Sequence, residues 1–246
     1  MVQFPEEPEA RMQRSRDIRV FPRVAGALTY AKTQATAIAF CAVRRVIRVN
    51  SVIAHHLVHM GYGHWLSNDP RGSGSKELRE EKFADLGPVH FGRKKQQPSK
   101  QKLREFYHEA EQRLDFEPLW FDQPMRIIIA DAFARVAKEH GYTVWACAVL
   151  RDHGHQAIRV HRDAGHLMWE HMALASRDLL RAEGLVPKDH PVWSNRPYVV
   201  FKTTVPAVRK CIGYIEDNPP KHGLPRQVYP WVTRYDGWPL RSRGKR

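Results

Sequence analysis

The chain has 246 residues, 42% of them hydrophobic, which is enough for one sizeable domain with an insertion or for two small domains. Forty lysines and arginines against 26 acidic residues give a formal net charge of +14, which favours a polyanionic partner, nucleic acid first and an anionic membrane second. No apolar run approaches the roughly 20 residues of a membrane-spanning helix, so we expect a soluble protein.

The cysteines and the two ends of the chain add further limits. Cys41, Cys147 and Cys211 are isolated and odd in number, which excludes a disulfide framework and a four-cysteine zinc site and favours a reducing cytoplasm. Residues 1–48 do not begin like a signal peptide and are expected to form an extension of unknown structure. Residues 236–246 are expected to be a basic tail.

The first predicted elements surround a charged insertion. A strand is expected at 51–60, because the segment is short and rich in β-branched and apolar residues, and a loop of turn-forming residues follows it. Residues 74–120 are charged and irregular, are most basic at 92–102, and contain one predicted helix near 103–114. We interpret this segment as an insertion into the domain.

The next segment predicts a helix and a hairpin. Asp122 is a suitable N-cap, and apolar residues at helical spacing continue until Gly141, so the helix is expected between them. A buried strand at 143–150, a tight corner or bulge at 152–154 and a second strand at 155–160 then form the hairpin.

The remaining elements complete a recognisable order. A helix is predicted at 164–182, a strand at 198–203 and a closing helix at 205–217, which the following prolines stop. Strand, helix, strand, strand, helix, strand is the order of a ferredoxin-like α+β fold, so we expect one antiparallel sheet with the helices packed on one face and a basic insertion after the first strand. This domain is expected to cover 49–235.

Two histidines stand one residue apart in the predicted hairpin. Alternate residues of a strand project to the same side, so His153 and His155 can point at one spot, as the ligands of a divalent cation do. The chain has 14 histidines, however, and paired surface histidines explain the same spacing. The pair alone leaves both interpretations open.

The closing helix carries a second group of candidate residues. Tyr214 lies off its apolar stripe, and Asn218, four residues later, lies on the same flank as Tyr214. The amide oxygen of Asn218 can be a third, hard metal ligand, and the oxygen of Tyr214 can be a nucleophile. The alternative is that Tyr214 is a half-buried packing residue and that Asn218 ends the helix before Pro219.

Taken together, these segments resemble the REP-associated tyrosine transposases of the single-tyrosine HUH transposase family. The resemblance covers about residues 52–231, outside the insertion, and includes the His-x-His strand, the "YVVFK" strand and the "YPW" tail at 229–231. Gly154 departs from the family pattern, whose middle residue is large and apolar, so the strand end is expected to lose an anchor on the opposite face of the sheet. The family segment "YI..NP.K.GL" is matched by Tyr214, Ile215, Asn218, Pro219, Lys221, Gly223 and Leu224.

The resemblance implies a mechanism and a location. His153 and His155 would bind Mg²⁺ or Mn²⁺ with Asn218 as the third ligand, in a protein of the prokaryotic cytoplasm and nucleoid. Tyr214 would attack a phosphodiester of single-stranded or hairpin DNA, leaving a 5′-phosphotyrosine and a free 3′-OH, and the reverse reaction with another 3′-OH would join strands. A phenol with a pKa of about 10 needs such a cation or a hydrogen bond to become a good nucleophile near neutrality.

Basic residues around these positions are candidates for holding DNA phosphates: Lys202, Arg196, Arg209, Lys210 and Lys221. Direct metal ligation by His55, His56 or His59 of the first strand is not expected.

Two other functions stay open: a decayed or non-catalytic nucleic-acid-binding protein on the same scaffold, and a metal-dependent hydrolase that uses water in place of the tyrosine. The target DNA and the choice between monomer and homodimer are also open.

Overall fold

The computed structural model describes residues 51–194 and 197–239. The expected N-terminal extension, the candidate residue Arg196 and the tail from residue 240 lie outside the described residues.

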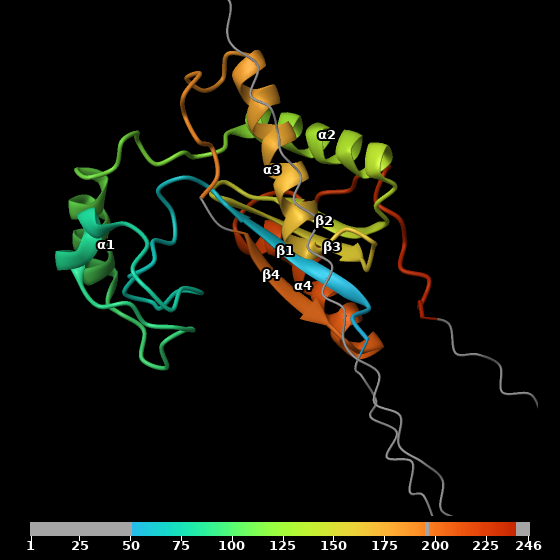
Figure 1. The fold of residues 1–246 in the computed structure, drawn as a ribbon, viewed down its shortest axis with the longest axis horizontal. Helices are drawn as coiled ribbons and strands as arrows, with labels where there is room; N and C mark the ends of the chain where they lie inside the picture. The colour runs from blue at the N-terminus through green and yellow to red at the C-terminus, as the bar shows by residue number, and fades with distance from the viewer. Residues whose placement is uncertain (1–50, 195–196, 240–246) are drawn as a thin grey trace, which may run out of the picture. The chain divides into compact units, whose positions relative to one another are not determined.

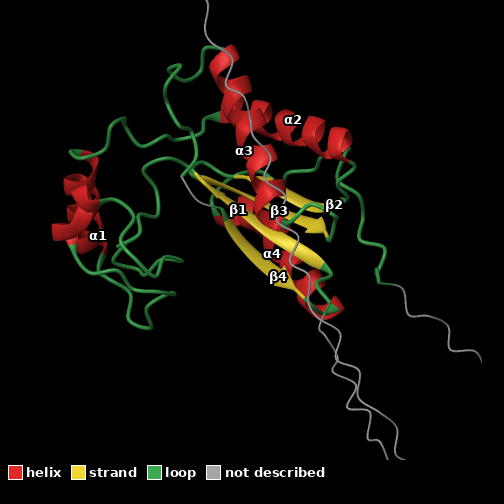
Figure 2. Cartoon of the chain, in the orientation of Figure 1, coloured by secondary structure: helices red, strands yellow, loops and turns green. Residues whose placement is uncertain are grey.

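Within the described ranges, four strands form one antiparallel sheet in the order β2-β3-β1-β4 (Figure 1). Figure 2 shows them as one sheet with helices around it. This order and the helices between the strands confirm the predicted ferredoxin-like α+β fold. The strands are β1 (Ala54–Met60), β2 (Val144–Val149), β3 (His153–Arg159) and β4 (Tyr198–Lys202).

Side chains cap the start of three of the four α-helices in the described residues. Asp122 accepts a hydrogen bond from the backbone N–H of Met125 at 2.9 Å and starts α2, and Gly141, with φ of 71°, ends it in the left-handed conformation that favours glycine. Ser99 caps α1 in the same way, through the N–H of Lys102. The helices are α1 (Lys100–Glu111), α2 (Gln123–His140), α3 (Gly165–Ala182) and α4 (Val205–Lys221), with a short 3₁₀ helix, η1 (Glu81–Leu86).

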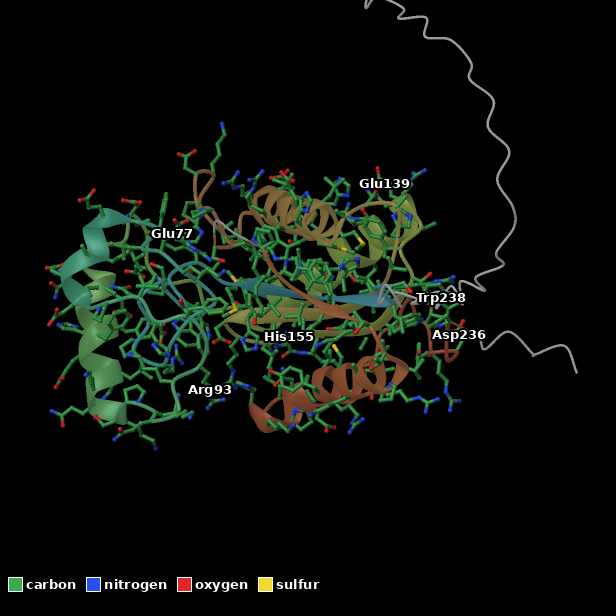
Figure 3. All side chains as sticks on the ribbon, turned by 60° about the horizontal axis from the view of Figure 1, so that its bottom comes forward. Glu77, Arg93, Glu139, His155, Asp236 and Trp238 are labelled. Carbon is green, nitrogen blue, oxygen red and sulfur yellow. The ribbon has the colours of Figure 1, made fainter. Side chains whose placement is uncertain are left out.

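Both faces of the sheet are covered. Cys147 and Val149 of β2 belong to the main core with α2 and α3, whereas their neighbour Ala148 packs against Cys211 and Ile215 of α4. Figure 3 shows α3 and α4 on opposite sides of the sheet. The expectation that all helices pack on one face therefore holds for α2 and α3 but not for α4. The reason is that successive residues of β2 are apolar on both sides, and each side must be buried.

Two boundaries differ from the prediction in ways that matter for function. The hairpin corner lies at 150–152, two residues before the predicted 152–154: the N–H of Leu150 donates to the carbonyl of His153 at 2.7 Å, and His153 is already the first residue of β3. The closing helix continues through Pro219 and Pro220 to Lys221. These prolines lie in the last turn, and the N–H groups of residues 222–224 satisfy the carbonyls of that turn.

The predicted insertion contains η1 and α1, the latter close to the helix expected near 103–114. Asp69, which is fully buried, pairs with Arg71 at 2.6 Å and accepts a hydrogen bond from Tyr107 of α1, so the loop after β1 is tied to that helix. Among the residues that the structure describes, no helix combines the length and hydropathy needed to cross a membrane.

Candidate active site

His153 and His155 lie together at the beginning of β3, on the face that α4 covers. Both are buried, and their rings are 4.7 Å apart at the centroids and nearly perpendicular. Figure 3 shows His155 between the sheet and α4. β3 pairs with β1 on one side and β2 on the other, so this strand is fixed along both edges.

Gly154 between them is held more firmly than the sequence led us to expect. It pairs with Val149 on β2 and with His59 on β1. On the opposite face of the sheet, a Cβ at this position would lie 3.8 Å from the ring of Phe133 and 3.9 Å from the Cβ of His59. The anchor that a large residue would supply is therefore replaced by Phe133 and His59, which stacks on Trp169 of α3.

His56, on β1, positions the second histidine of the pair. Its Nε2 lies 3.1 Å from Nδ1 of His155, whereas Nε2 of His155 is buried without a hydrogen-bond partner. When the Nδ1–H of His155 donates to His56, the buried Nε2 carries a lone pair, which is the form in which imidazole binds a metal.

Asp152 positions the first histidine in the same manner. Its Oδ1 lies 2.6 Å from Nδ1 of His153. A hydrogen bond from this nitrogen to the carboxylate leaves the lone pair of His153 on Nε2. Each histidine of the pair thus has one nitrogen committed to the protein and the other available to a ligand.

The surroundings keep the central imidazoles neutral. Burial lowers the pKa of His155 well below its usual range, and the charge of neighbouring histidines, His153 first, adds to this. Burial, with a smaller contribution from Lys202, lowers the pKa of His56 to about 4. Because only the neutral ring can bind a cation, these rings do not need to lose a proton before a metal binds at neutral pH.

Tyr214 projects from α4 toward the histidines while its side chain remains 47% exposed. Its ring centroid lies 5.5 Å from that of His155 and 6.0 Å from that of His56, both at steep angles. A phenol held against His155 and His56 and nearly half exposed to solvent is accessible to a large substrate.

Asn218 follows Tyr214 by one helical turn and is buried, and its amide nitrogen has no hydrogen-bond partner. Turning the amide over exchanges its nitrogen and oxygen with almost no change in shape, so Asn218 can present either atom.

The donor set fits a divalent cation on these observations. His153 and His155 offer imidazole nitrogens, and two of the six buried side-chain atoms without a partner in the described residues, Nε2 of His155 and the amide nitrogen of Asn218, belong to residues that the sequence proposed as ligands. A buried polar atom without a partner is costly, and a bound ion would relieve that cost.

The basic candidates differ in their relation to Tyr214. Nζ of Lys221 lies 6.0 Å from the centroid of the Tyr214 ring, Lys202 is close enough to His56 to lower its pKa, and Lys210 is exposed one turn before Tyr214 on α4. Arg209 instead lies near Tyr235, where its charge opposes the burial that raises the pKa of that phenol.

Sequence reasoning missed two residues of this group. His56 hydrogen-bonds His155, and the ring of His222, which is exposed after α4, lies 5.6 Å from that of His153. The alternation of side chains along β1 separates His56 from His55 and His59, but its partner on β3 depends on a register that local sequence does not contain.

A separate group of possible metal ligands lies at the other end of β3. The ligand atoms of His140, Asp163 and His171 are all within 4.8 Å of one another. None of these residues belongs to the group around Tyr214.

The comparisons with known proteins are sparse. No protein-family model matches the chain, and no curated protein matches it. One similar solved structure is that of a REP-associated tyrosine transposase bound to a REP hairpin, with 22% sequence identity and a TM-score of 0.36 over 44% of this chain. The chain spans 64% of that protein.

Proposed function

We propose that this protein is a metal-dependent DNA endonuclease and strand transferase that uses Tyr214 as its nucleophile on single-stranded or hairpin DNA. The observation that carries the proposal is the contact of the solvent-accessible Tyr214 with His155, a buried histidine whose Nε2 has no protein partner and whose ring lies against that of His153.

The proposed reaction takes place at the phenolic oxygen of Tyr214. Its phenolic oxygen attacks phosphorus, the bond from phosphorus to the 3′ oxygen breaks, and the products are a 5′-phosphotyrosine and a 3′-OH that has gained a proton. Attack of another 3′-OH on the phosphotyrosine restores the phenol and joins two strands. The exposure of Tyr214 allows both DNA ends to reach it.

His153, His155 and Asn218 are the residues that would hold the cation, as Mg²⁺ or Mn²⁺. When bound, such an ion polarises the scissile phosphate and neutralises the charge that develops on it. Asp152 and His56 would fix the orientation of the two imidazoles through their Nδ1 atoms and leave each Nε2 for the cation.

The net charge of the chain supports a nucleic-acid substrate. Lys202 and Lys221 border Tyr214 and can bind the phosphates on either side of the scissile bond, whereas Lys210 extends the basic border by one turn of α4. Contacts with phosphates do not depend on the base sequence, so the target sequence must be selected by contacts with the bases or by the shape of the DNA.

The test is the formation of a covalent protein–DNA adduct. The full-length protein is mixed with Mn²⁺ and a labelled DNA hairpin that has a single-stranded 5′ extension, and the mixture is denatured and separated by electrophoresis. We expect a labelled band at the mass of the protein plus the DNA fragment, and its loss in Tyr214→Phe and on addition of EDTA.

Tyr198→Phe is the matched control, because Tyr198 is a tyrosine of β4 with a similar exposed fraction, 49%. It should form the adduct as the parent protein does. Hairpin binding without any adduct would indicate a non-catalytic binding protein, and cleavage that survives Tyr214→Phe would indicate a hydrolase that uses water. Either result contradicts the proposal.

A further inference from the structure

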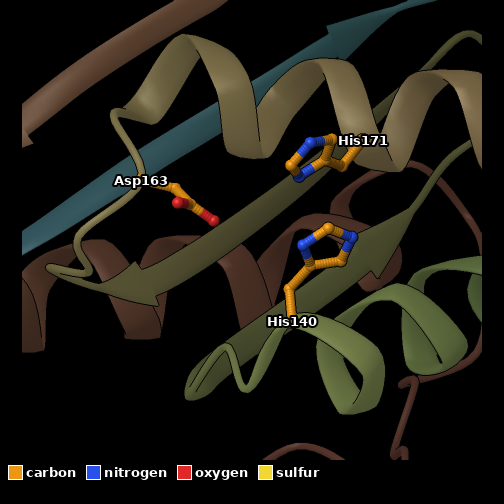
Figure 4. Close-up of side chains that lie close together, drawn as sticks. All are labelled: His140, Asp163 and His171. Carbon is orange, nitrogen blue, oxygen red and sulfur yellow. The ribbon is translucent and has the colours of Figure 1, made fainter.

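The end of β3 that lies away from Tyr214 carries a second cluster of metal-binding side chains. His140 is the last residue of α2, Asp163 lies in the loop between β3 and α3, and His171 projects from the second turn of α3. Figure 4 shows the carboxylate and both rings directed toward one another. The end of α2, the loop after β3 and α3 thus converge with all ligand atoms within 4.8 Å.

Tyr142 organises this cluster by contacting two of its members. Its hydroxyl donates to Oδ2 of Asp163 at 2.8 Å and lies 2.7 Å from Nδ1 of His171. Since the hydroxyl has one proton and gives it to the carboxylate, it accepts from the Nδ1–H of His171. The lone pair of His171 is then on Nε2, which is the nitrogen that would bind an ion.

Asp163 and His140 also have atoms that could bind a metal ion. Oδ1 of Asp163 pairs with the exposed Arg162 at 3.9 Å, a distance that leaves room for a closer ligand. The ring of His140 stacks on that of His171 with centroids 4.1 Å apart, and its contacts are with rings rather than with hydrogen-bond partners. All three side chains are half-buried, so small rotations can bring them to the spacing that a bound ion requires.

From this arrangement we propose that His140, Asp163 and His171 form a zinc site, separate from the site at Tyr214. Two imidazoles and one carboxylate are a donor set that Zn²⁺ takes in tetrahedral sites with bonds of about 2.0–2.2 Å, with a water as fourth ligand. Mg²⁺ is disfavoured here because it prefers oxygen ligands.

The position explains how an ion would reach the site and what it would do there. His140 also lines an open hollow with Gly141, Thr143 and Arg159, so solvent reaches the cluster. A bound ion would join the end of α2 to the loop before α3 and to α3 itself. Those two helices cover one face of the sheet, so the ion would stabilise this layer.

His161 is close but is committed elsewhere. Its Nδ1 accepts the backbone N–H of Asp163 at 3.2 Å, so it is not one of the three ligands. The length of β3, about 20 Å for a strand of this size, separates the cluster from His153 and His155. Loss of one site should therefore leave the other intact.

The experiment uses the full-length protein with Zn²⁺ or Co²⁺ alone as the probe. Bound Co²⁺ is counted by its visible absorption, and Zn²⁺ binding is measured by calorimetry and by the rise in melting temperature. We expect His140→Ala to lose one equivalent of Co²⁺ and the corresponding Zn²⁺-induced rise in melting temperature. His166→Ala, which changes an exposed histidine of α3, is the matched control and should behave as the parent protein does.

Two further variants keep the proposal falsifiable. Tyr142→Phe keeps the ring and removes the hydroxyl that positions Asp163 and His171, so the affinity for Zn²⁺ should fall about 10–100-fold while the fold is retained. His153→Ala should leave this equivalent of Co²⁺ in place. The proposal is overturned if His140→Ala binds Co²⁺ and Zn²⁺ as His166→Ala does, or if His153→Ala abolishes all binding.

Discussion

Replacing Gly154 by alanine should stabilise the protein, and the structure gives the size of the effect. Gly154 lies within β3 and its φ is not in the left-handed region, so alanine can adopt the same backbone conformation. The added methyl would lie 3.6 Å from the carbonyl oxygen of Ala148 and 3.8 Å from Phe133, which are ordinary contact distances. The mutation therefore adds a buried methyl group without displacing a neighbour.

The expected gain combines two contributions. Restricting the unfolded chain contributes about 0.4–1 kcal/mol to the free energy of unfolding, and burying a methyl group contributes about 0.8 kcal/mol. The sum, about 1–2 kcal/mol, should raise the melting temperature by about 2–4 °C for each kcal/mol in a protein of this size. A branched residue such as isoleucine should instead destabilise by about 1–3 kcal/mol, because Phe133 and His59 already fill the space.

The assay is thermal and urea unfolding of the parent protein, Gly154→Ala, Gly154→Ile and the control Gly141→Ala. Gly141 has a φ of 71°, so alanine there should cost about 1–2 kcal/mol although no atom lies near it. The account of Gly154 is wrong if its alanine variant is no more stable than the parent, or if isoleucine stabilises. In either case the contacts of Phe133 and His59 do not replace the missing side chain.

Three further predictions concern the histidines and lysines around the sheet. Burial lowers the pKa of His59 to about 3 from 6.5, so below pH 6.5 the unfolded chain binds a proton that the folded chain does not. The contribution of His59 to the free energy of unfolding should therefore be nearly constant well above pH 6.5 and fall by about 2 kcal/mol between pH 6.5 and 5, in addition to the falls from His56 and His155, whose pKa values burial also lowers. Urea unfolding at each pH should show a shallower slope of stability against pH in His59→Phe. His56→Phe keeps a ring but removes the hydrogen bond to His155, so calorimetry should show an affinity for Mn²⁺ that is about 10–100-fold lower. An unchanged affinity would show that His56 does not position His155. Affinity for the hairpin's single strand should fall steeply with salt, and Lys202→Ala or Lys221→Ala should each reduce the slope of log K against log salt by about 0.7; a slope near zero in the parent protein would contradict phosphate binding.

Local sequence patterns were sufficient for the elements and for much of the candidate site. Caps such as Asp122 and Gly141 define helix ends through backbone hydrogen bonds of adjacent residues, so they can be read directly from the chain. The same is true of Tyr214 and Asn218, whose common flank follows from helical spacing alone.

Contacts between elements that are distant in the sequence could not be predicted from local patterns. The packing of α4 on the second face of the sheet depends on which apolar residues of β2 would otherwise be exposed to solvent. The contact of His56 with His155 depends on the register of β1 with β3. The reason for Gly154 lies in Phe133 and His59, which come from two other elements. The cluster of His140, Asp163 and His171 likewise forms only when three segments meet, and no spacing in the chain indicates it.

The most direct measurement is to locate the DNA on the protein. After reaction of the full-length protein with hairpin DNA and Mn²⁺, the adduct is digested with trypsin and nuclease and analysed by mass spectrometry. Cleavage after Lys210 and Lys221 releases a peptide in which Tyr214 is the only tyrosine. We predict that this peptide carries the nucleotide through a phosphotyrosyl bond, whereas a nucleotide on any other peptide, or on none, would contradict the assignment of Tyr214 as the nucleophile.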